Sequence, residues 1–222
     1  KKTILITGAG TDIGRDAAFA LAARGHTVYA STFSDEQADA LRLQCKTRGM
    51  ALNVFRMDIT SEADRAQINA LTLDVLINNA GIGESGSLAE VDMARIRRVF
   101  EVNLFGTLAL TQLALKPMIA RGSGTVLFVS SIAGRVPMPF LMPYSMTKFA
   151  LSAAGAGLRA EMDQLGRNIQ IALIEPGAIH TGFNQAMSNT KYDWMGPDSY
   201  FYAQASQMKA KEDRTFRFLE AR

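Results

Sequence analysis

Tyr144 and Lys148 are the residues whose types and spacing best suit acid–base chemistry. They stand four positions apart in the run YSMTK, which places them one turn apart on the same face of a helix. A tyrosine ordinarily has a pKa of about 10, but a neighbouring ammonium favours the phenolate and lowers that value. We therefore expect this pair to exchange a proton with a bound molecule near neutral pH.

Ser131 and Asn103 complete a possible catalytic group. Ser131 ends the run GTVLFVSS, where its hydroxyl would donate a hydrogen bond that polarises a substrate oxygen. Ser130, beside it, is interpreted as structural. Each residue also has a structural explanation: a strand-ending serine, a helical asparagine at a kink near Gly106, or an exposed helical pair. Their combination favours the catalytic interpretation.

A glycine-rich loop, TGAGTDIG, spans residues 7–14. It follows an apolar run and opens a helical pattern, and the N–H groups at a helix N-terminus favour a bound anion. The loop therefore predicts a phosphate site, although glycine loops also serve as plain tight turns. Asp12 places a negative charge within it, and we expect its carboxylate to cap the helix that starts near Ile13.

Short apolar runs alternate with longer helical patterns along the chain. The expected strands are 3–7, 26–31, 51–58, 74–80, 124–131 and 169–177. The expected helices are 14–25, 34–49, 61–71, 93–122 (interrupted near Gly106) and 143–166. Strands that are apolar almost throughout suit a parallel sheet covered on both faces. The alternation predicts an α/β fold: a single Rossmann-type domain over 1–222, with a doubly wound parallel sheet and helices on both faces.

The segment 181–205 departs from this alternation. It gathers aromatic residues around Gly196 and Pro197, and we expect an irregular substrate loop, or alternatively a partner surface.

Taken in order, these motifs resemble the classical short-chain dehydrogenases/reductases. The glycine loop matches the family's TGxxxGxG at Thr7, Gly8 and Gly14, with Asp12 replacing the middle glycine. Further matches, in the expected order, are DIT at 58–60, NNAG at 78–81, Asn103, Ser131, Tyr144, Lys148, and IEPGAIHT at 174–181. Their joint occurrence is far more specific than any one of them.

The resemblance implies an NAD(P)-dependent oxidoreductase that transfers hydride between a nicotinamide cofactor and an alcohol or carbonyl, with Ser131, Tyr144, Lys148 and Asn103 as its catalytic residues. Lys148 would also hold the nicotinamide ribose, and Asn103 would anchor a water that relays protons to it. The implied cofactor contacts are Gly8, Thr11, Asp12, Ile13, Gly14, Thr32, Asp58, Ile59, Asn79, Ala80, Gly81, Tyr144, Lys148, Pro176, Gly177, Ile179 and Thr181. No metal site is expected.

The choice between NADP and NAD depends on two residues. NAD-binding members usually place an acid at the end of the second strand, where this chain has Thr32, and the missing acid favours NADP. The alternative is that Asp12 lies near the adenosine ribose and favours NAD.

The substrate is expected to be a hydrophobic alcohol, ketone or aldehyde. The apolar stretch between Ser131 and Tyr144, together with the segment after Thr181, would line its pocket through Pro137, Met138, Phe140, Leu141 and Phe183. These residues have packing as their alternative role. The runs KFALSAAGAGLRAEM and IEPGAIHTGF resemble the retinol and 17β-hydroxysteroid dehydrogenase-like branch. Rival interpretations are a 3-ketoacyl-type carbonyl reductase and a non-catalytic NAD(P)-binding regulator.

Composition restricts the remaining classes. The 222 residues carry a net charge of +3 without a basic run, which argues against nucleic-acid binding. The sequence has no uninterrupted apolar run long enough to predict a membrane span. The first strand pattern begins at Thr3 and leaves no room for a signal peptide. We therefore expect a cytoplasmic location. Small residues after Lys148 (Ala153, Gly157) favour a homodimer or homotetramer. The family's seventh strand is not visible, so we expect C-terminal truncation.

Overall fold

The computed structural model describes residues 1–220, which contain a six-stranded parallel sheet. Its strands are β1 Thr3–Ile6, β2 Thr27–Thr32, β3 Asn53–Arg56, β4 Val75–Asn78, β5 Ser123–Val129 and β6 Asn168–Ile174. They are ordered β3-β2-β1-β4-β5-β6, and every neighbouring pair is parallel. Each strand lies within a run expected from the sequence or within a residue of it, and the predicted fold class is confirmed.

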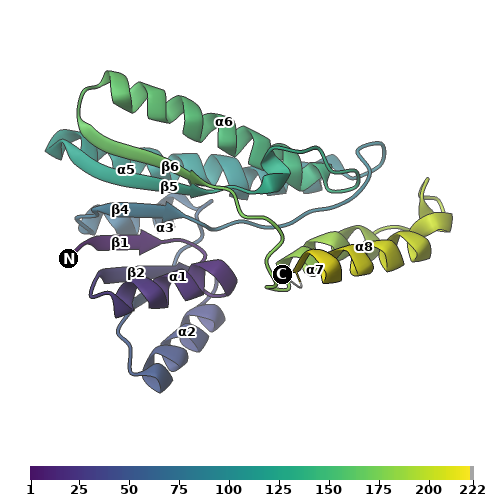
Figure 1. Ribbon diagram of the computed structural model, residues 1–222, viewed down its shortest axis with the longest axis horizontal. Coiled ribbons are helices and arrows are strands. Elements are labelled where there is room, and N and C mark those ends of the chain that lie inside the picture. Colours follow the sequence, from purple (N-terminus) through teal and green to yellow (C-terminus); the bar gives the residue numbers. More distant parts are fainter. Residues whose placement is uncertain (221–222) are drawn as a thin grey trace.

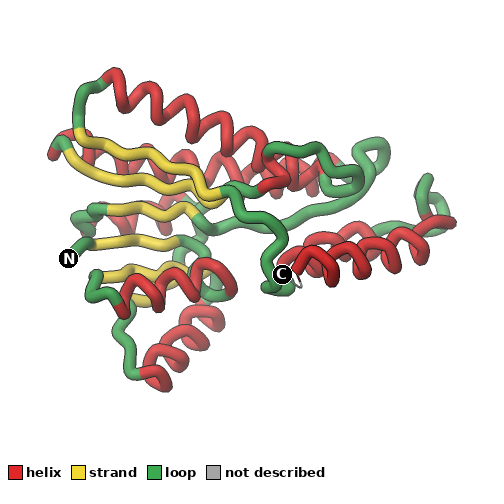
Figure 2. The backbone as a smooth tube through the Cα atoms, viewed as in Figure 1, coloured by secondary structure: helices red, strands yellow, loops and turns green. Residues whose placement is uncertain are grey.

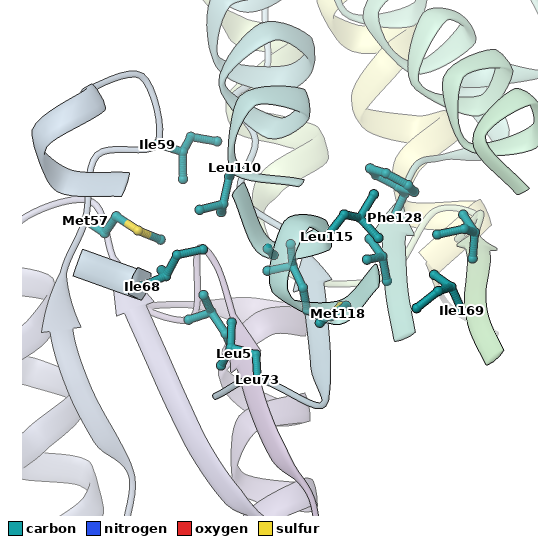
Figure 3. Close-up of a cluster of buried hydrophobic side chains, with 14 of the residues drawn as sticks. Leu5, Met57, Ile59, Ile68, Leu73, Leu110, Leu115, Met118, Phe128 and Ile169 are labelled. Carbon is teal, nitrogen blue, oxygen red and sulfur yellow. The ribbon is translucent and has the colours of Figure 1, made fainter. Parts of the chain in front are cut away.

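Helices cover both faces of this sheet (Figures 1 and 2). They are α1 Asp12–Ala23, α2 Asp35–Arg48, α3 Glu62–Arg65, α4 Met93–Phe100, α5 Thr107–Arg121, α6 Met142–Gln164, α7 Phe183–Asn189 and α8 Ala205–Glu220. Helices α1 and α2 contribute to one buried apolar cluster, and α5 and α6 contribute to the other. Figure 3 shows the second cluster, which includes Leu110 and Leu115 of α5 and Phe128 of β5.

Strand β1 shows why the central strands are apolar throughout. Side chains alternate across a strand, so Ile4 and Ile6 enter the cluster beneath α1 and α2, whereas Leu5 enters the cluster beneath α5. All three are almost completely buried. A strand with a helix layer on each side has no solvent-facing position, and its sequence therefore lacks the alternation of a half-exposed strand.

Local signals fix the ends of the helices. The Ser34 and Ser61 hydroxyls accept hydrogen bonds from the N–H groups of Gln37 and Asp64, capping α2 and α3. The expected break near Gly106 is a π-helical turn, η2 Glu101–Gly106, which joins α4 to α5.

The order of the strands brings four motifs to one edge of the sheet. The chain winds outward from β1 in one direction and from β4 in the other, so a crevice forms where these two strands lie side by side. The segments that follow β1, β4, β5 and β6 all leave from the carboxyl ends of the strands, and these segments carry the glycine loop, NNAG, Ser131 and IEPG.

The C-terminal segment is more regular than the sequence suggests. The stretch expected to be an irregular loop contains α7 and the 3₁₀ turns Thr190–Asp193 and Tyr202–Gln204. Hydrogen bonds fasten it to the loop after β4: the Ser85 hydroxyl donates to the carbonyl of Ser188 at 3.1 Å and accepts from the Lys191 N–H at 3.1 Å. Helices α7 and α8 thus lie beyond the carboxyl ends of the strands (Figure 1).

Among the described residues, one helical run has the length and mean hydropathy of a membrane span, Met93–Arg121. Half of its most apolar window is buried inside the protein, where α5 packs on the sheet.

Candidate active site

A cleft of about 540 Å³ opens at the carboxyl edge of the sheet. Residues from the segments after β1 to β6 line it. Every predicted cofactor contact except Thr32 lines this cleft. Lining residues that sequence reasoning missed are Gly10, Phe33, Gln37, Met57, Thr60, Ile82, Arg98, Glu101, Val102, Val129, Ser130 and Asn184.

The glycine loop has no space for a side chain at Gly8 or Gly14. Gly8 has φ +63°, and a Cβ there would lie 2.7 Å from the Cα of Ala80. A Cβ on Gly14 would lie 2.5 Å from both the Asn79 Nδ2 and the Gly8 carbonyl oxygen. The loop is therefore pressed against NNAG, and the N-terminus of α1 opens on the cleft with N–H groups that have no acceptor within the helix. This cradle fits a diphosphate.

Asn79 holds the glycine loop in place as well as lining the cleft. Its Nδ2 donates to the carbonyls of Thr7 and Gly8 at 3.0 and 3.1 Å. In return the Thr7 hydroxyl oxygen accepts from the N–H groups of Asn79 and Ala80, each at 3.0 Å. The ends of β1 and β4 are thus joined by four hydrogen bonds.

Asp12 does not cap α1, and that prediction was wrong. The residue that precedes the helix is Thr11, and Asp12 is the first helical residue. Its φ of +53° lies in the left-handed region, which glycine adopts readily and aspartate tolerates better than most residues. This backbone conformation explains why the family pattern has glycine here.

Thr32 is the predicted cofactor contact that lies outside the cleft. It is buried, and its hydroxyl donates to the Ser34 carbonyl at 3.0 Å. Phe33 and Gln37 line the cleft at this point instead, and Gln37 Oε1 accepts from the Phe33 N–H at 3.2 Å. The position of Phe33 could have been predicted from the end of β2, because the residue that directly follows a strand turns towards the crevice.

Ser131, Tyr144 and Lys148 come together in the cleft. Tyr144 and Lys148 are almost fully buried, and the Lys148 Nζ lies 5.6 Å from the centre of the Tyr144 ring. That Nζ donates a 2.8 Å hydrogen bond to the carbonyl of Val129 at the end of β5. The Ser131 side chain lies close enough to the Tyr144 phenol to lower its pKa slightly.

Burial is the main cause of the pKa shifts of Tyr144 and Lys148. It raises the pKa of Tyr144 to about 12, and the Ser131 side chain lowers that pKa only in part. Burial also lowers the pKa of Lys148 to about 8. The expectation that Lys148 depresses the pKa of Tyr144 is therefore not met by the protein's own groups, because burial penalises the phenolate more than its neighbours favour it.

Asn103 lies behind the cleft wall. It sits in the π-helical turn, where its Oδ1 accepts from the Ile82 N–H at 2.8 Å and its Nδ2 donates to the Ile82 carbonyl at 2.9 Å. The same Nδ2 donates to the Thr147 hydroxyl at 3.1 Å. Asn103 thus ties the segment after β4 to helix α6 beside Lys148.

Only part of the predicted substrate pocket faces the cleft. Phe183 lines it, with its ring 5.8 Å from that of Tyr144. Met138 and Leu141 pack instead against a small apolar cluster that includes Tyr144. Phe140 has φ +63°, and its ring meets Phe201 edge-on at 5.0 Å. Pro137, like these three, is outside the lining.

The family described as short chain dehydrogenase matches residues 2–192. The chain therefore belongs to the short-chain dehydrogenase family, whose members are NAD(P)-binding oxidoreductases.

Particular relatives agree with this assignment. The chain is 29% identical over 204 residues to 17-beta-hydroxysteroid dehydrogenase 13 of Rattus norvegicus, covering 89% of this chain and 68% of the relative. It is 32% identical over 198 residues to the uncharacterized oxidoreductase YbbO of Escherichia coli K12, covering 87% and 71%. A short-chain dehydrogenase from Streptomyces avermitilis superposes with a TM-score of 0.76 at 28% identity, covering 98% of this chain and 82% of that structure. The expected likeness to the hydroxysteroid dehydrogenase branch is confirmed.

The buried Lys148 predicts a pH-dependent stability. Its pKa is about 8 in the folded protein and about 10.4 when unfolded. Between these values the unfolded chain binds more protons, so the contribution of Lys148 to the free energy of unfolding rises with pH. From pH 7 to pH 10 we expect wild type to gain about 2 kcal/mol relative to Lys148→Met in denaturant titrations. Lys46→Met, at an exposed lysine, should keep the wild-type slope. Parallel curves for wild type and Lys148→Met would contradict the burial of a charged lysine.

Proposed function

We propose that the protein is an NAD(P)-dependent oxidoreductase that transfers hydride between the cofactor and a hydrophobic alcohol or carbonyl, with Tyr144 as the acid–base group. The observation that carries this proposal is the convergence of Ser131, Tyr144 and Lys148 in one cleft with the glycine loop. A regulator without turnover would not need this group, which argues against that alternative.

The residues of the cleft fit the cofactor. The cradle of Gly8 and Gly14 at the start of α1 would hold the diphosphate, and Asp58 with Ile59 would meet the adenine. Lys148 would bind the nicotinamide ribose, and the Pro176–Gly177 segment would bind the amide. When bound, the cofactor supplies or accepts the hydride.

The protonation states suit reduction of a carbonyl. With a pKa of about 12, Tyr144 keeps its proton at neutral pH and can donate it to the oxygen of a reduced carbonyl. Ser131 would donate a hydrogen bond to the same oxygen and stabilise its developing charge. Lys148, whose pKa is about 8, is mainly charged at neutral pH and would stabilise the phenolate left behind.

We propose NADP as the preferred cofactor. The end of β2 presents no acid to the cleft: Thr32 is buried there, and Phe33 and Gln37 are uncharged. Nothing at this point repels a 2′-phosphate. Asp12, which lines the cleft, opposes the preference because its carboxylate adds a negative charge.

A hydrophobic substrate is supported by the apolar lining on the Tyr144 side of the cleft, where Ile179 and Phe183 lie. One relative of the chain is named as a 17-beta-hydroxysteroid dehydrogenase. A 3-ketoacyl-type substrate is the rival, and a panel containing both kinds of ketone separates them.

Replacing Tyr144 by Phe should remove turnover while leaving cofactor binding intact. Loss of a positioned general acid lowers kcat by about 10² to 10⁴-fold, and the phenyl ring keeps the packing against Phe183. Nicotinamide absorbance across a panel of apolar ketones and aldehydes measures kcat, and fluorescence titration measures the cofactor Kd. Equal kcat in wild type and Tyr144→Phe would refute the assigned role.

Removing the charge of Asp12 should strengthen NADPH binding selectively. One unit charge a few ångströms from a phosphate in water is worth about 1 kcal/mol, or about fivefold in Kd. We expect wild type to bind NADPH more tightly than NADH, and Asp12→Asn and Asp12→Gly both to widen that ratio. Asn keeps the tolerance for positive φ, so an effect confined to Gly would indicate backbone strain instead of charge. Tighter NADH binding by wild type would overturn the NADP proposal.

A further inference from the structure

Glu175 lies where three catalytic segments of the cleft meet. It follows β6 and directly precedes Pro176 and Gly177, which line the cleft. Its Oε1 accepts a 2.7 Å hydrogen bond from the Ser152 hydroxyl of α6 and a 2.8 Å hydrogen bond from the Nε of Arg135, which follows Ser131 by one short turn. One oxygen of Glu175 thus joins the segment after β6 to α6 and to the segment after β5.

The hydrogen bonds continue inward from Ser152. Its hydroxyl oxygen lies 2.8 Å from that of Ser130, and the Ser130 hydroxyl also lies 3.1 Å from the backbone carbonyl of Lys148. Both serines are almost fully buried, whereas Glu175 is partly exposed. A polar chain therefore runs from the surface to the backbone of the lysine that stands beside Tyr144.

Ionised Glu175 fixes the direction of this chain. Each serine hydroxyl has one proton to donate, and a carboxylate only accepts. Ser152 donates its proton to Glu175, so its oxygen can only accept from Ser130. The single Ser130 proton is therefore shared between the Ser152 oxygen and the Lys148 carbonyl. The hydrogen bond from Ser152, followed by the hydrogen bond and charge of Arg135, lowers the pKa of Glu175 against the opposing effect of burial.

Backbone hydrogen bonds join the same segments. The Ser130 N–H donates to the Ile174 carbonyl at 2.8 Å, and the Ile132 N–H donates to the Pro176 carbonyl at 3.0 Å. These bonds align the ends of β5 and β6 but do not reach α6. The end of β5 reaches α6 through the Ser130 hydroxyl and through the Lys148 Nζ, which donates to the Val129 carbonyl. Glu175, through Ser152, adds a link from the segment after β6 to the same helix.

We propose that Glu175 is a positioning residue for the oxidoreductase reaction: through its hydrogen bond with Ser152 it holds α6 in place relative to Ser131 and to Pro176–Gly177. The inference rests on the proposed function. An exposed Arg–Glu pair alone would have little effect, so the buried hydroxyls carry the role.

The test compares Glu175→Ala, Glu175→Gln and Ser152→Ala with Glu161→Ala, which removes an exposed glutamate from the same helix. For each variant, kcat for an apolar ketone is divided by the number of NADPH sites per chain found by fluorescence titration. A small misplacement of catalytic groups costs up to about 10²-fold in rate. We expect Glu175→Ala and Ser152→Ala to lose about tenfold in kcat per binding site.

Glu175→Gln retains an oxygen acceptor for Ser152, and we expect it to stay within about threefold of wild type. A merely structural role would lower the number of NADPH sites and leave kcat per site unchanged. The inference is overturned by Glu175→Ala with a kcat per site equal to that of Glu161→Ala. It is also overturned if Arg135→Ala reproduces the full loss while Ser152→Ala has none.

A wild-type protein that turns over no ketone or alcohol would refute the proposed function separately. Hydrogen exchange at residues 144–152 then decides the inference. Faster exchange there in Glu175→Ala than in Glu161→Ala supports the link from Glu175 to α6, and equal exchange overturns it.

Discussion

The ammonium group of Lys148 is buried, and that costly placement is the constraint on which the arrangement of the cleft depends. A charge removed from water must find compensating partners. The protein supplies the carbonyl of Val129 at 2.8 Å, and Lys148 also lines the open cleft. The Nζ of this lysine lies 5.6 Å from the centre of the Tyr144 ring, so the buried charge and the buried phenol share one part of the cleft.

The segments around Lys148 are joined to one another by hydrogen bonds close to that residue. Asn103 in the π-helical turn joins the segment after β4 to Thr147, the neighbour of Lys148. Ser130 reaches the Lys148 carbonyl from β5. On the other side of the sheet's crevice, Asn79 and Thr7 hold the glycine loop against NNAG. The Tyr144–Lys148 pair and the glycine loop are thus positioned by separate hydrogen-bond networks built on adjacent strands.

Much of this arrangement could be predicted from the sequence. Strands such as β1 are apolar because both faces are covered, and the order of motifs along the chain specified where Ser131, Tyr144 and Lys148 would meet. Properties that depend on the three-dimensional surroundings of a residue could not be predicted from the sequence. The positive φ of Asp12, the burial of Thr32 and the raised pKa of Tyr144 are set by the folded surroundings of these residues and not by residue type alone. The pocket residues before Tyr144 were misplaced because apolar character does not distinguish packing from ligand contact. The assembly state, cellular location and domain count remain predictions.

The most direct test of the central claim, that this cleft transfers hydride, follows an isotope. The protein is incubated with an apolar ketone and NADPH that carries deuterium at both C4 positions of the nicotinamide, and the alcohol product is analysed by mass spectrometry. The account predicts an alcohol with a single deuterium on its carbinol carbon for each cofactor oxidised. Cofactor that binds but stays reduced, or an alcohol without deuterium, would contradict it.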